Sequence, residues 1–411
     1  MSAGTRYAAD WAGLLRSPLN GESLRAEGPW LLGDGETLWP CLAGIPYLRV
    51  GRDELREAAV SAISRGDRAG ALALLLSDRK DDTIPAVEPA SVLRAIGTGL
   101  TARETMDLLG YGALAPYFLH RWSLPTFLSG IALLETHARA GDVVCEIGCG
   151  LGQFLYAWTA AGAGTTVFGS DLVFSHLWLA RRYTCPGARL VCFDADATFP
   201  LVDAVADVIF SHDSFHYFRR KAHVLSEMRR ISSRRALLLG HVHNAEHPNH
   251  SPGSPLSPEE YRDLIEPDLV YDDADLTEAA LTATAPRPRS TRSPPPSPAL
   301  AFVREGASSA SGPSRPPGVS HPSVPRTPCL SVPAPGARLR VNPLIGAAGV
   351  EWPGARFEDE FVDGWPYLSE LRAPHPDEIR PGEIRLMEEN DERLAVLARR
   401  RVLLQLPDRW L

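Results

Sequence analysis

The sequence has no apolar run that approaches the roughly 20 residues of a transmembrane helix. Runs such as ALALLL (71–76) and ALLLG (236–240) are the size of core segments. The first residues, MSAGTRYAADWAGLL, also lack the basic start and the following apolar run of a secretory signal. We therefore expect no membrane segment and a cytoplasmic location.

Cysteine pairs and excess positive charge are absent as well. Lys and Arg number 42 and Asp and Glu number 50, giving a net charge of −8. A chain this acidic is poorly suited to phosphate backbones, so we do not expect nucleic acid as a partner. No CxxC pair occurs, which argues against a disulfide framework or a cysteine-rich zinc site and suits a reducing compartment. The six cysteines are Cys41, Cys145, Cys149, Cys185, Cys192 and Cys329.

One segment differs from the rest in composition. Residues 285–340 contain fourteen prolines, ten serines and eight arginines, but a single acidic residue, Glu305. Proline at this density prevents helices and sheet interiors, so we expect an extended linker over 305–337, preceded by a short strand at 298–305.

The linker implies a division of the chain into further units. We expect a small β-rich segment (1–52), a helical connector (53–140), a central domain (141–304) and a C-terminal α+β module (338–411). In that module the pattern predicts extended pieces at ARLRVN and ARFEDEFV. It also predicts a helix over 383–404, where apolar residues recur at spacings that fit one buried face.

Strand-like and helix-like patterns alternate between residues 142 and 270. Apolar runs at 142–147, 165–170, 189–193, 207–212 and 235–241 are separated by helical patterns such as FLYAWTAA and FSHLWLARRY. The alternation predicts right-handed crossovers and an α/β fold with a doubly wound, mostly parallel sheet. Ligands of such sheets bind at the carboxyl ends of the strands, where the polar features of this region fall.

The first apolar run ends in a glycine-rich turn, EIGCGLG (146–152). A dinucleotide fingerprint would need glycine where this chain has Gln153. The GxGxG form instead exposes bare backbone, against which the amino-acid tail of a ligand can lie. Asp171 follows the second run, where a carboxylate can bind ribose hydroxyls. Asp194, or Asp196 two residues further on, follows the third run.

Together these features resemble the S-adenosylmethionine-dependent methyltransferases of the Rossmann-like class, class I. The resemblance covers about residues 140–245 and includes the ExGxGxG turn, FDADATFP after the third strand and ADVIFSHDSFHYF at the fourth. The proline-glycine turn usual before the fifth strand is replaced by SSRR (232–235).

The resemblance implies a seven-stranded-type sheet and S-adenosyl-L-methionine as the cofactor. The cofactor-binding residues that it implies are Glu146, Gly148, Gly150 and Gly152 at the methionine side, Asp171 at the ribose, and Asp194 with Ala195 at the adenine. Asp213, after the fourth strand, would lie near the methionine amino group or the transferred methyl group.

Histidines gather in the second half of this region. Methyl transfer to oxygen or nitrogen needs alignment, exclusion of water and, for a hydroxyl or a protonated amine, a base that works near neutral pH. Histidine meets that requirement, and we take His216 and His243, with Asp213, as the catalytic candidates. Seven of the twelve histidines lie within 39 residues: His212, His216, His223, His241, His243, His247 and His250.

A divalent metal site is the alternative function for the same histidines. It would use HVHN (241–244) with His247 and His250, or with Asp213, because an HxH pair at a strand end places both rings on one side of the sheet. Metal-assisted methyltransferases usually rely on carboxylates, and this loop offers only Glu246. We therefore expect no metal.

The N-terminal segment 14–50 resembles the small zinc-ribbon-like domain that opens several bacterial methyltransferases and activates tRNA and protein methyltransferases. The shared features are LLxxPxxxxxL and a tryptophan-proline pair before GIPYL. Ser17 and Asn20 stand where the first pair of thiol ligands would be, and neither can replace a thiolate. We expect a metal-free brace or lid.

These observations favour an enzyme, a methyltransferase that acts on oxygen or nitrogen of a small molecule. The acidic balance and the flanking segments that can close a pocket favour a small acceptor. Two alternatives stay open: a tRNA, rRNA or protein methyltransferase, and a non-catalytic cofactor-binding subunit. The aromatic-rich segment 113–138 supplies candidate acceptor contacts, namely Tyr117, His120, Arg121 and Trp122.

Overall fold

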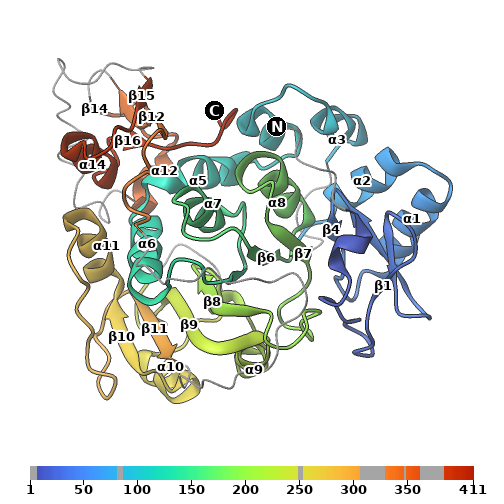
Figure 1. Ribbon diagram of the computed structural model, residues 1–411, viewed down its shortest axis with the longest axis horizontal. Helices are drawn as coiled ribbons and strands as arrows, with labels where there is room; N and C mark the ends of the chain where they lie inside the picture. The colour runs from blue at the N-terminus through green and yellow to red at the C-terminus, as the bar shows by residue number, and fades with distance from the viewer. Residues whose placement is uncertain (1–6, 81–86, 249–252, 306–328, 347–348, 362–383) are drawn as a thin grey trace.

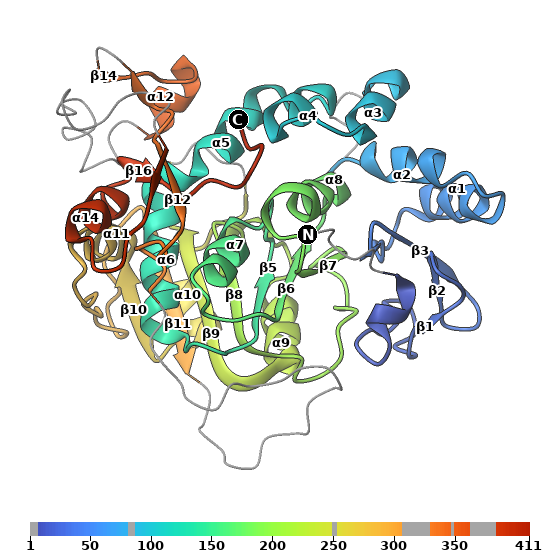
Figure 2. The same cartoon turned by 45° about the horizontal axis from the view of Figure 1, so that its top comes forward.

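A seven-stranded sheet with helices on both faces forms the centre of the protein (Figures 1 and 2). The structure is a computed structural model, which describes residues 7–80, 87–248, 253–305, 329–346, 349–361 and 384–411. The strand order is β10-β11-β9-β8-β5-β6-β7. The α/β class and the seven-stranded-type sheet predicted from the sequence are confirmed.

Five strands of the sheet are parallel and one hairpin closes its far edge. The parallel strands are β5 (Val144–Ile147), β6 (Val167–Asp171), β7 (Arg189–Cys192), β8 (Ala206–His212) and β9 (Ser232–His243). β11 (Ala299–Glu305) runs antiparallel to β9, and β10 (Leu269–Asp272) antiparallel to β11. β11 is the strand predicted before the linker.

Both faces of this sheet are buried, which explains why its strands are continuous apolar runs. Successive residues of a strand alternate between two core clusters: Val208 and Phe210 belong to one, and Ile209 belongs to the other. The first cluster lies under α6 (Pro125–His137), α7 (Gln153–Ala160) and α8 (Phe174–Leu179), which continues as a π-helix over Ala180–Thr184. The second lies under α9 (Lys221–Ile231) and α10 (Pro258–Ile265). α11 (Asp273–Thr282) packs along α6.

The predicted β-rich N-terminal segment is a four-stranded antiparallel sheet. After the 3-10 helix Ala8–Trp11 it contains β1 (Arg25–Ala26), β2 (Leu31–Gly33), β3 (Leu38–Leu42) and β4 (Ile45–Pro46). Ser17 Oγ accepts the Leu19 N–H at 3.4 Å, and Asn20 Oδ1 accepts the Glu22 N–H at 3.0 Å. Ser17 and Asn20 therefore each stabilise a turn by a side-chain hydrogen bond.

This segment extends the central sheet at the β7 edge. The Leu48 N–H donates to the carbonyl of Cys192 at 2.7 Å, and Tyr47 pairs with Cys192 as a parallel bridge. A buried ion pair joins it to the helices that follow: the Arg49 guanidinium lies 2.7 Å from Asp78, which also accepts from the Tyr47 hydroxyl. The segment is thus bound both to the sheet edge and to the helical connector.

The helical connector arches over the carboxyl ends of the parallel strands (Figure 2). Its helices are α1 (Asp53–Ser64), α2 (Arg68–Leu76), α3 (Pro89–Ile96), α4 (Ala102–Leu108) and α5 (Ala115–His120), with a 3-10 turn before α5 at Gly112–Leu114 and another after it at Arg121–Ser123. Within the described parts of the chain, no helix has the length and apolar character that a bilayer span requires.

The C-terminal module differs from the prediction in two places. β12 (Arg338–Val341) lies between β15 (Ile384–Leu386) and β16 (Leu403–Leu404), and β13 (Ile345–Gly346) pairs with β14 (Gly349–Val350). The helix predicted over 383–404 is wrong: only α14 (Glu392–Arg399) is helical, because Asn390 adopts a positive φ of 62° and Asp391 caps the helix at the Leu394 N–H. The extended piece predicted at ARFEDEFV is also wrong, since α12 spans Ala355–Phe361.

Most of the predicted linker, residues 306–328, lies outside the described residues. Its last part does not behave as an exposed spacer. Leu330 and Ser331 are buried, and both backbone N–H groups donate to the Glu135 carboxylate on α6. This last part of the predicted linker is therefore docked on α6.

We expect Asp78→Ala to lower the free energy of unfolding by about 3–5 kcal/mol, because it leaves the Arg49 guanidinium buried without its counter-ion. Chemical denaturation followed by circular dichroism measures the change. Asp263→Ala, at an exposed ion pair with Arg262, is the control and should leave stability unchanged. Equal effects of the two substitutions would contradict this role of the Arg49–Asp78 pair.

Candidate active site

The glycine-rich turn between β5 and α7 needs its glycines for two physical reasons. Gly148, Gly150 and Gly152 have φ values of 77°, 52° and 70°, which side-chain-bearing residues adopt at a cost. A Cβ at Gly148 would lie 2.7 Å from the Cβ of Ser214, and one at Gly152 would lie 2.6 Å from Cys185 Sγ. The turn is therefore packed closely from below, and a larger residue at either position would displace it.

Glu146 lies at the start of this turn and is almost fully buried. Its Oε2 atom has no hydrogen-bond partner among the described residues. Burial raises the pKa of the Glu146 carboxyl well above its ordinary value, although the Arg121 guanidinium opposes the shift. A buried carboxyl oxygen without a partner is costly, so this atom is suited to receive a donor from a ligand.

Asp171 ends β6 and meets the glycine turn directly. The Gly150 N–H donates to its Oδ2 at 3.0 Å and the Val173 N–H to its Oδ1 at 2.8 Å, while His176 Nδ1 lies 3.1 Å from Oδ1. Burial alone would raise the pKa of Asp171, but His176 and the two backbone donors outweigh it and hold the pKa below its ordinary value. The sequence placed Gly150 and Asp171 at one site, and the structure joins them by a hydrogen bond.

Asp194 and Ala195 follow β7 at the same edge of the sheet. Asp194 Oδ1 accepts the Asp196 N–H at 2.9 Å, forming a local turn. Asp196, the alternative two residues further on, accepts the backbone N–H groups of Arg219 and Arg220 and so holds the loop before α9. Of the two aspartates, Asp194 is the one without that structural task.

Aromatic side chains cover the hydrogen bond between Gly150 and Asp171. The Phe118 ring of α5 lies over Gly150, since a Cβ there would be 3.2 Å from the ring, and its centroid is 5.0 Å from that of His176. Tyr111 packs on both rings, and its hydroxyl lies 3.0 Å from Ser175 Oγ. The space above the turn is therefore filled by side chains of the connector.

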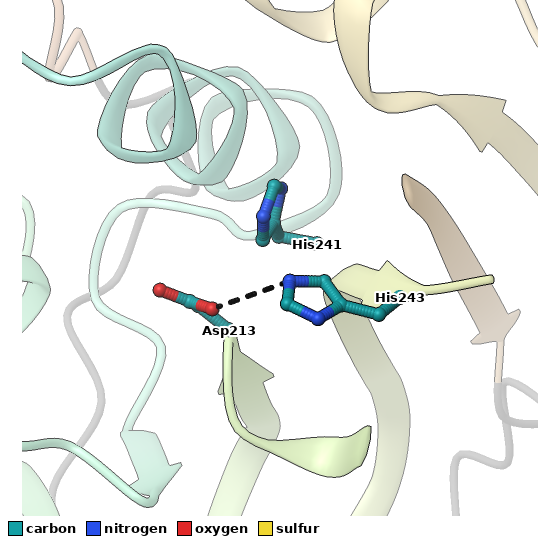
Figure 3. A group of neighbouring side chains, drawn as sticks. All are labelled: Asp213, His241 and His243. Carbon is teal, nitrogen blue, oxygen red and sulfur yellow. Dashed lines mark ion pairs between the residues drawn. The ribbon is translucent and has the colours of Figure 1, made fainter. Parts of the chain in front are cut away.

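Asp213, directly after β8, is the centre of a second polar group (Figure 3). Its Oδ2 accepts from the Tyr117 hydroxyl at 2.5 Å and from Arg121 Nη1 at 3.0 Å, and its Oδ1 lies 3.9 Å from His243 Nε2. Burial would raise the pKa of Asp213, but Arg121 and the neighbouring histidines outweigh it and lower the pKa. Of the four predicted acceptor contacts, Tyr117 and Arg121 thus reach this group.

The other two predicted acceptor contacts face a different part of the molecule. His120 packs edge-on against Phe357 of the C-terminal module, and Trp122 packs edge-on against Trp410. Both side chains are buried there. They hold the connector against the C-terminal module and do not point to Asp213.

The two histidines predicted as bases lie together but differ in what they can do. The rings of His216 and His243 stack, with centroids 3.7 Å apart. His216 is fully buried, and neither of its ring nitrogens has a hydrogen-bond partner in the described part of the chain. Burial, and then the nearby His243, lower the pKa of His216 to about 2. This environment argues against His216 as a base near neutral pH and leaves His243, which faces Asp213.

His241, which has a well-defined carboxylate partner, was not among the histidines predicted as bases. His241 Nδ1 lies 2.9 Å from Asp273 Oδ2, at the start of α11. Burial would lower the pKa of His241, but Asp273 outweighs it and raises the pKa. Asp273 lies 32 residues further along the chain and belongs to no motif, so only the HxH pattern itself pointed to this position.

Both Asp213 and His241 have positive φ values, 54° and 46°. Such values are uncommon for residues other than glycine and cost energy that the surrounding structure must supply. The Asp213 N–H donates to the carbonyl of Gly240 at 3.0 Å, which ties the two strained strand ends together. In this backbone conformation, the side chains of Asp213 and His241 point toward the same place beyond the sheet.

The sequence of the region that carries this geometry matches a known family model. Residues 145–239 match the model of the methyltransferase domain. This part of the chain is therefore a methyltransferase domain. This domain is of the Rossmann-like class I, the enzyme class that uses S-adenosyl-L-methionine as its cofactor.

Solved structures of methyltransferases resemble part of the chain. One contains the methyltransferase activator and a methyltransferase of Haloferax volcanii, with 23% identity, 36% of this chain and 68% of that chain covered, and a TM-score of 0.32. A methyltransferase from Aquifex aeolicus has 16% identity, covers 46% of this chain and 96% of its own, and has a TM-score of 0.34. A TehB-like methyltransferase from Corynebacterium glutamicum has 15% identity, 43% and 87% coverage, and a TM-score of 0.33. No curated protein sequence matches this chain.

Asp213, His241 and His243 also have the composition of a metal site, with one ligand atom of each within 4.8 Å of the others. The surrounding charges disfavour a divalent cation there. Arg121 places a permanent positive charge 3.0 Å from the Asp213 carboxylate, and His241 is already held by Asp273. His247 bonds the carbonyl of Pro296 instead, and His250 lies outside the described residues. We therefore treat the three residues as a polar group of the methyltransferase domain without a metal.

If this group binds no metal, chelation should have no effect on the fold. A bound ion would stabilise the folded state by mass action. We expect the melting temperature, measured by differential scanning fluorimetry, to be the same before and after dialysis against EDTA. A drop on chelation that added zinc or another divalent ion restores, and that is lost in His241→Ala, would contradict the absence of a metal.

Proposed function

We propose that the protein transfers the methyl group of S-adenosylmethionine to an oxygen or nitrogen of a small-molecule acceptor, with a histidine of this site as the base. The observation that carries the proposal is the meeting of two groups at one sheet edge. The glycine turn and Asp171 are joined at 3.0 Å, and the Asp213–His243 group follows on the neighbouring strands β8 and β9.

In this proposal the cofactor lies across the carboxyl ends of β5, β6 and β7. Gly148, Gly150 and Gly152 hold the methionine side, where the partnerless Oε2 of Glu146 can accept from a donor of the ligand. Asp171 binds the ribose, and Asp194 with Ala195 borders the adenine. Two observations support the fit: the buried acceptor of Glu146, and a turn whose closely packed underside fixes its backbone.

The bound cofactor supplies a methyl group that is already activated by a sulfonium. The residues of this chain then have to orient the acceptor, exclude water and accept its proton. We assign the proton to His243, beside Asp213, and give His216 the task of a neutral ring that fixes His243 by stacking. His241, oriented by Asp273, is a second group at this position that can accept a proton.

A small acceptor fits the closure of the site by this chain's own segments. The connector places Tyr117 and Arg121 on Asp213 and Phe118 over Gly150, so the active site is enclosed by side chains. A long nucleic acid would need an open, basic surface instead. All six cysteines are free thiols, as expected of a protein in the cytoplasm.

The decisive experiment is to incubate the protein with a metabolite extract and methyl-labelled S-adenosylmethionine. We expect mass spectrometry to detect one or a few small molecules that carry the label, with S-adenosylhomocysteine as the second product. Label in RNA or protein, with binding that falls steeply with salt, would favour a macromolecular acceptor. Cofactor binding without any labelled product would identify a non-catalytic subunit.

We further expect Asp171→Ala to weaken the binding of S-adenosylhomocysteine beyond detection by calorimetry while the circular dichroism spectrum stays unchanged. The substitution removes the carboxylate that the proposal places on the ribose. Asp196→Ala is the matched control, because Asp196 lies at the same sheet edge but holds the loop before α9. Unchanged affinity in Asp171→Ala, or an equal loss in Asp196→Ala, would refute the assignment.

A further inference from the structure

One short stretch of the connector touches both halves of the site. Phe118 of α5 lies over Gly150 and against His176. Tyr117, the residue before it, and Arg121, in the 3-10 turn directly after α5, donate to Asp213. A displacement of α5 would therefore uncover the glycine turn and release Asp213 at the same time.

The structure has α5 in a position that leaves no room above the turn. The Phe118 ring would be only 3.2 Å from a single carbon atom added to Gly150. Beneath it, both carboxylate oxygens of Asp171 accept from the protein, namely from Gly150, Val173 and His176. A ligand that packs against Gly150 on this side would therefore have to displace Phe118.

A segment from the other end of the chain holds α5 in this position. The Trp410 indole N–H donates to the carbonyl of Leu119, in α5, at 2.9 Å, and the indole packs edge-on against Trp122 with centroids 5.7 Å apart. The backbone of the same segment binds the start of α4: the Ala102 N–H donates to the carbonyl of Arg409 at 2.8 Å and the Arg103 N–H to that of Trp410 at 3.3 Å. Trp410 is 1% exposed.

These contacts bind the connector at two places, α4 and α5. Figure 2 shows the marked C end of the chain beside α5, above the carboxyl ends of the sheet. Arg409 also lies over the ring of Tyr183, whose hydroxyl donates to the carbonyls of Leu100 and Thr101 next to α4. The segment thus binds α4, α5 and the helix that follows β6 in one place.

We infer that residues 405–411 form a latch: Trp410 positions α5 so that Phe118 closes the cofactor site, and the cofactor binds when this latch releases. The inference rests on the proposed function in one respect, that the cofactor lies above Gly150 and Asp171. Trp410 acts here as a positioning residue, through Leu119 and Phe118, and contacts no reacting group.

The latch has a thermodynamic consequence that can be measured. A protein that binds only in a minor, open state has its apparent affinity reduced by the fraction of molecules in that state. Weakening the latch raises the open fraction, so the ligand associates faster and binds more tightly. Removing the Phe118 ring has the same effect without acting on the latch.

The experiment measures association of S-adenosylhomocysteine with the immobilised full chain by surface plasmon resonance. We expect Trp410→Phe, which keeps an aromatic ring but loses the N–H donor, to raise the association rate constant about threefold, and Trp410→Ala about tenfold. Phe118→Ala should raise it by a similar factor. In the double variant Phe118→Ala/Trp410→Ala, the second substitution should add nothing, because Trp410 acts through Phe118.

The control is a buried tryptophan whose ring contacts Arg56 of α1 rather than α4 or α5. Trp39, in β3 of the N-terminal sheet, is fully buried, so Trp39→Phe and Trp39→Ala measure the general effect of losing a buried indole. If the Trp410 variants associate at the wild-type rate, or if their effect persists in the Phe118→Ala background, the latch is refuted. If the wild-type and Phe118→Ala proteins both fail to bind S-adenosylhomocysteine, the cofactor assignment of the proposed function is refuted instead.

Discussion

The hydrogen bond from the Gly150 N–H to the Asp171 carboxylate connects the glycine-rich turn with the end of β6. The rest of the site depends on these two features. The hydrogen bond holds the turn after β5 against the end of β6 through a partly buried carboxylate, whose pKa His176 and two backbone donors hold below its ordinary value. Charge-assisted bonds of this kind are stronger than those between neutral groups. The close packing beneath Gly148 and Gly152 then restricts the conformation of the turn, so that its backbone is held in a fixed position.

The parts of this arrangement that the sequence could predict are those whose signal is local. The strands β5, β6, β7 and β8 follow from apolar runs, and the glycine turn and Asp171 follow from their place at the ends of β5 and β6. Because parallel strands end at one edge, their terminal residues had to meet. The end of a strand can be located from the local sequence, and in a parallel sheet the strand ends lie at the same edge.

Contacts between elements far apart in the chain could not be predicted from local sequence patterns. The His241–Asp273 pair depends on how α11 begins after β10, and the aromatic cover depends on the path of the connector over the sheet. The predicted helix over 383–404 failed for a related reason. Its apolar residues are shared between β15, which pairs with β12, and α14, so their helical spacing was produced by two elements in succession.

The N-terminal segment also affects the outer edge of the central sheet. The outer strand of a sheet presents unpaired backbone donors and acceptors, which invite a strand of another molecule and thereby aggregation. Here Tyr47 and Leu48 bind the backbone of Cys192, the last residue of β7, and cover that end of the edge. Covalent attachment keeps their local concentration at the edge high at any protein concentration. The end of β7 is therefore covered even when the protein is dilute, whereas a separate subunit would cover it only when abundant.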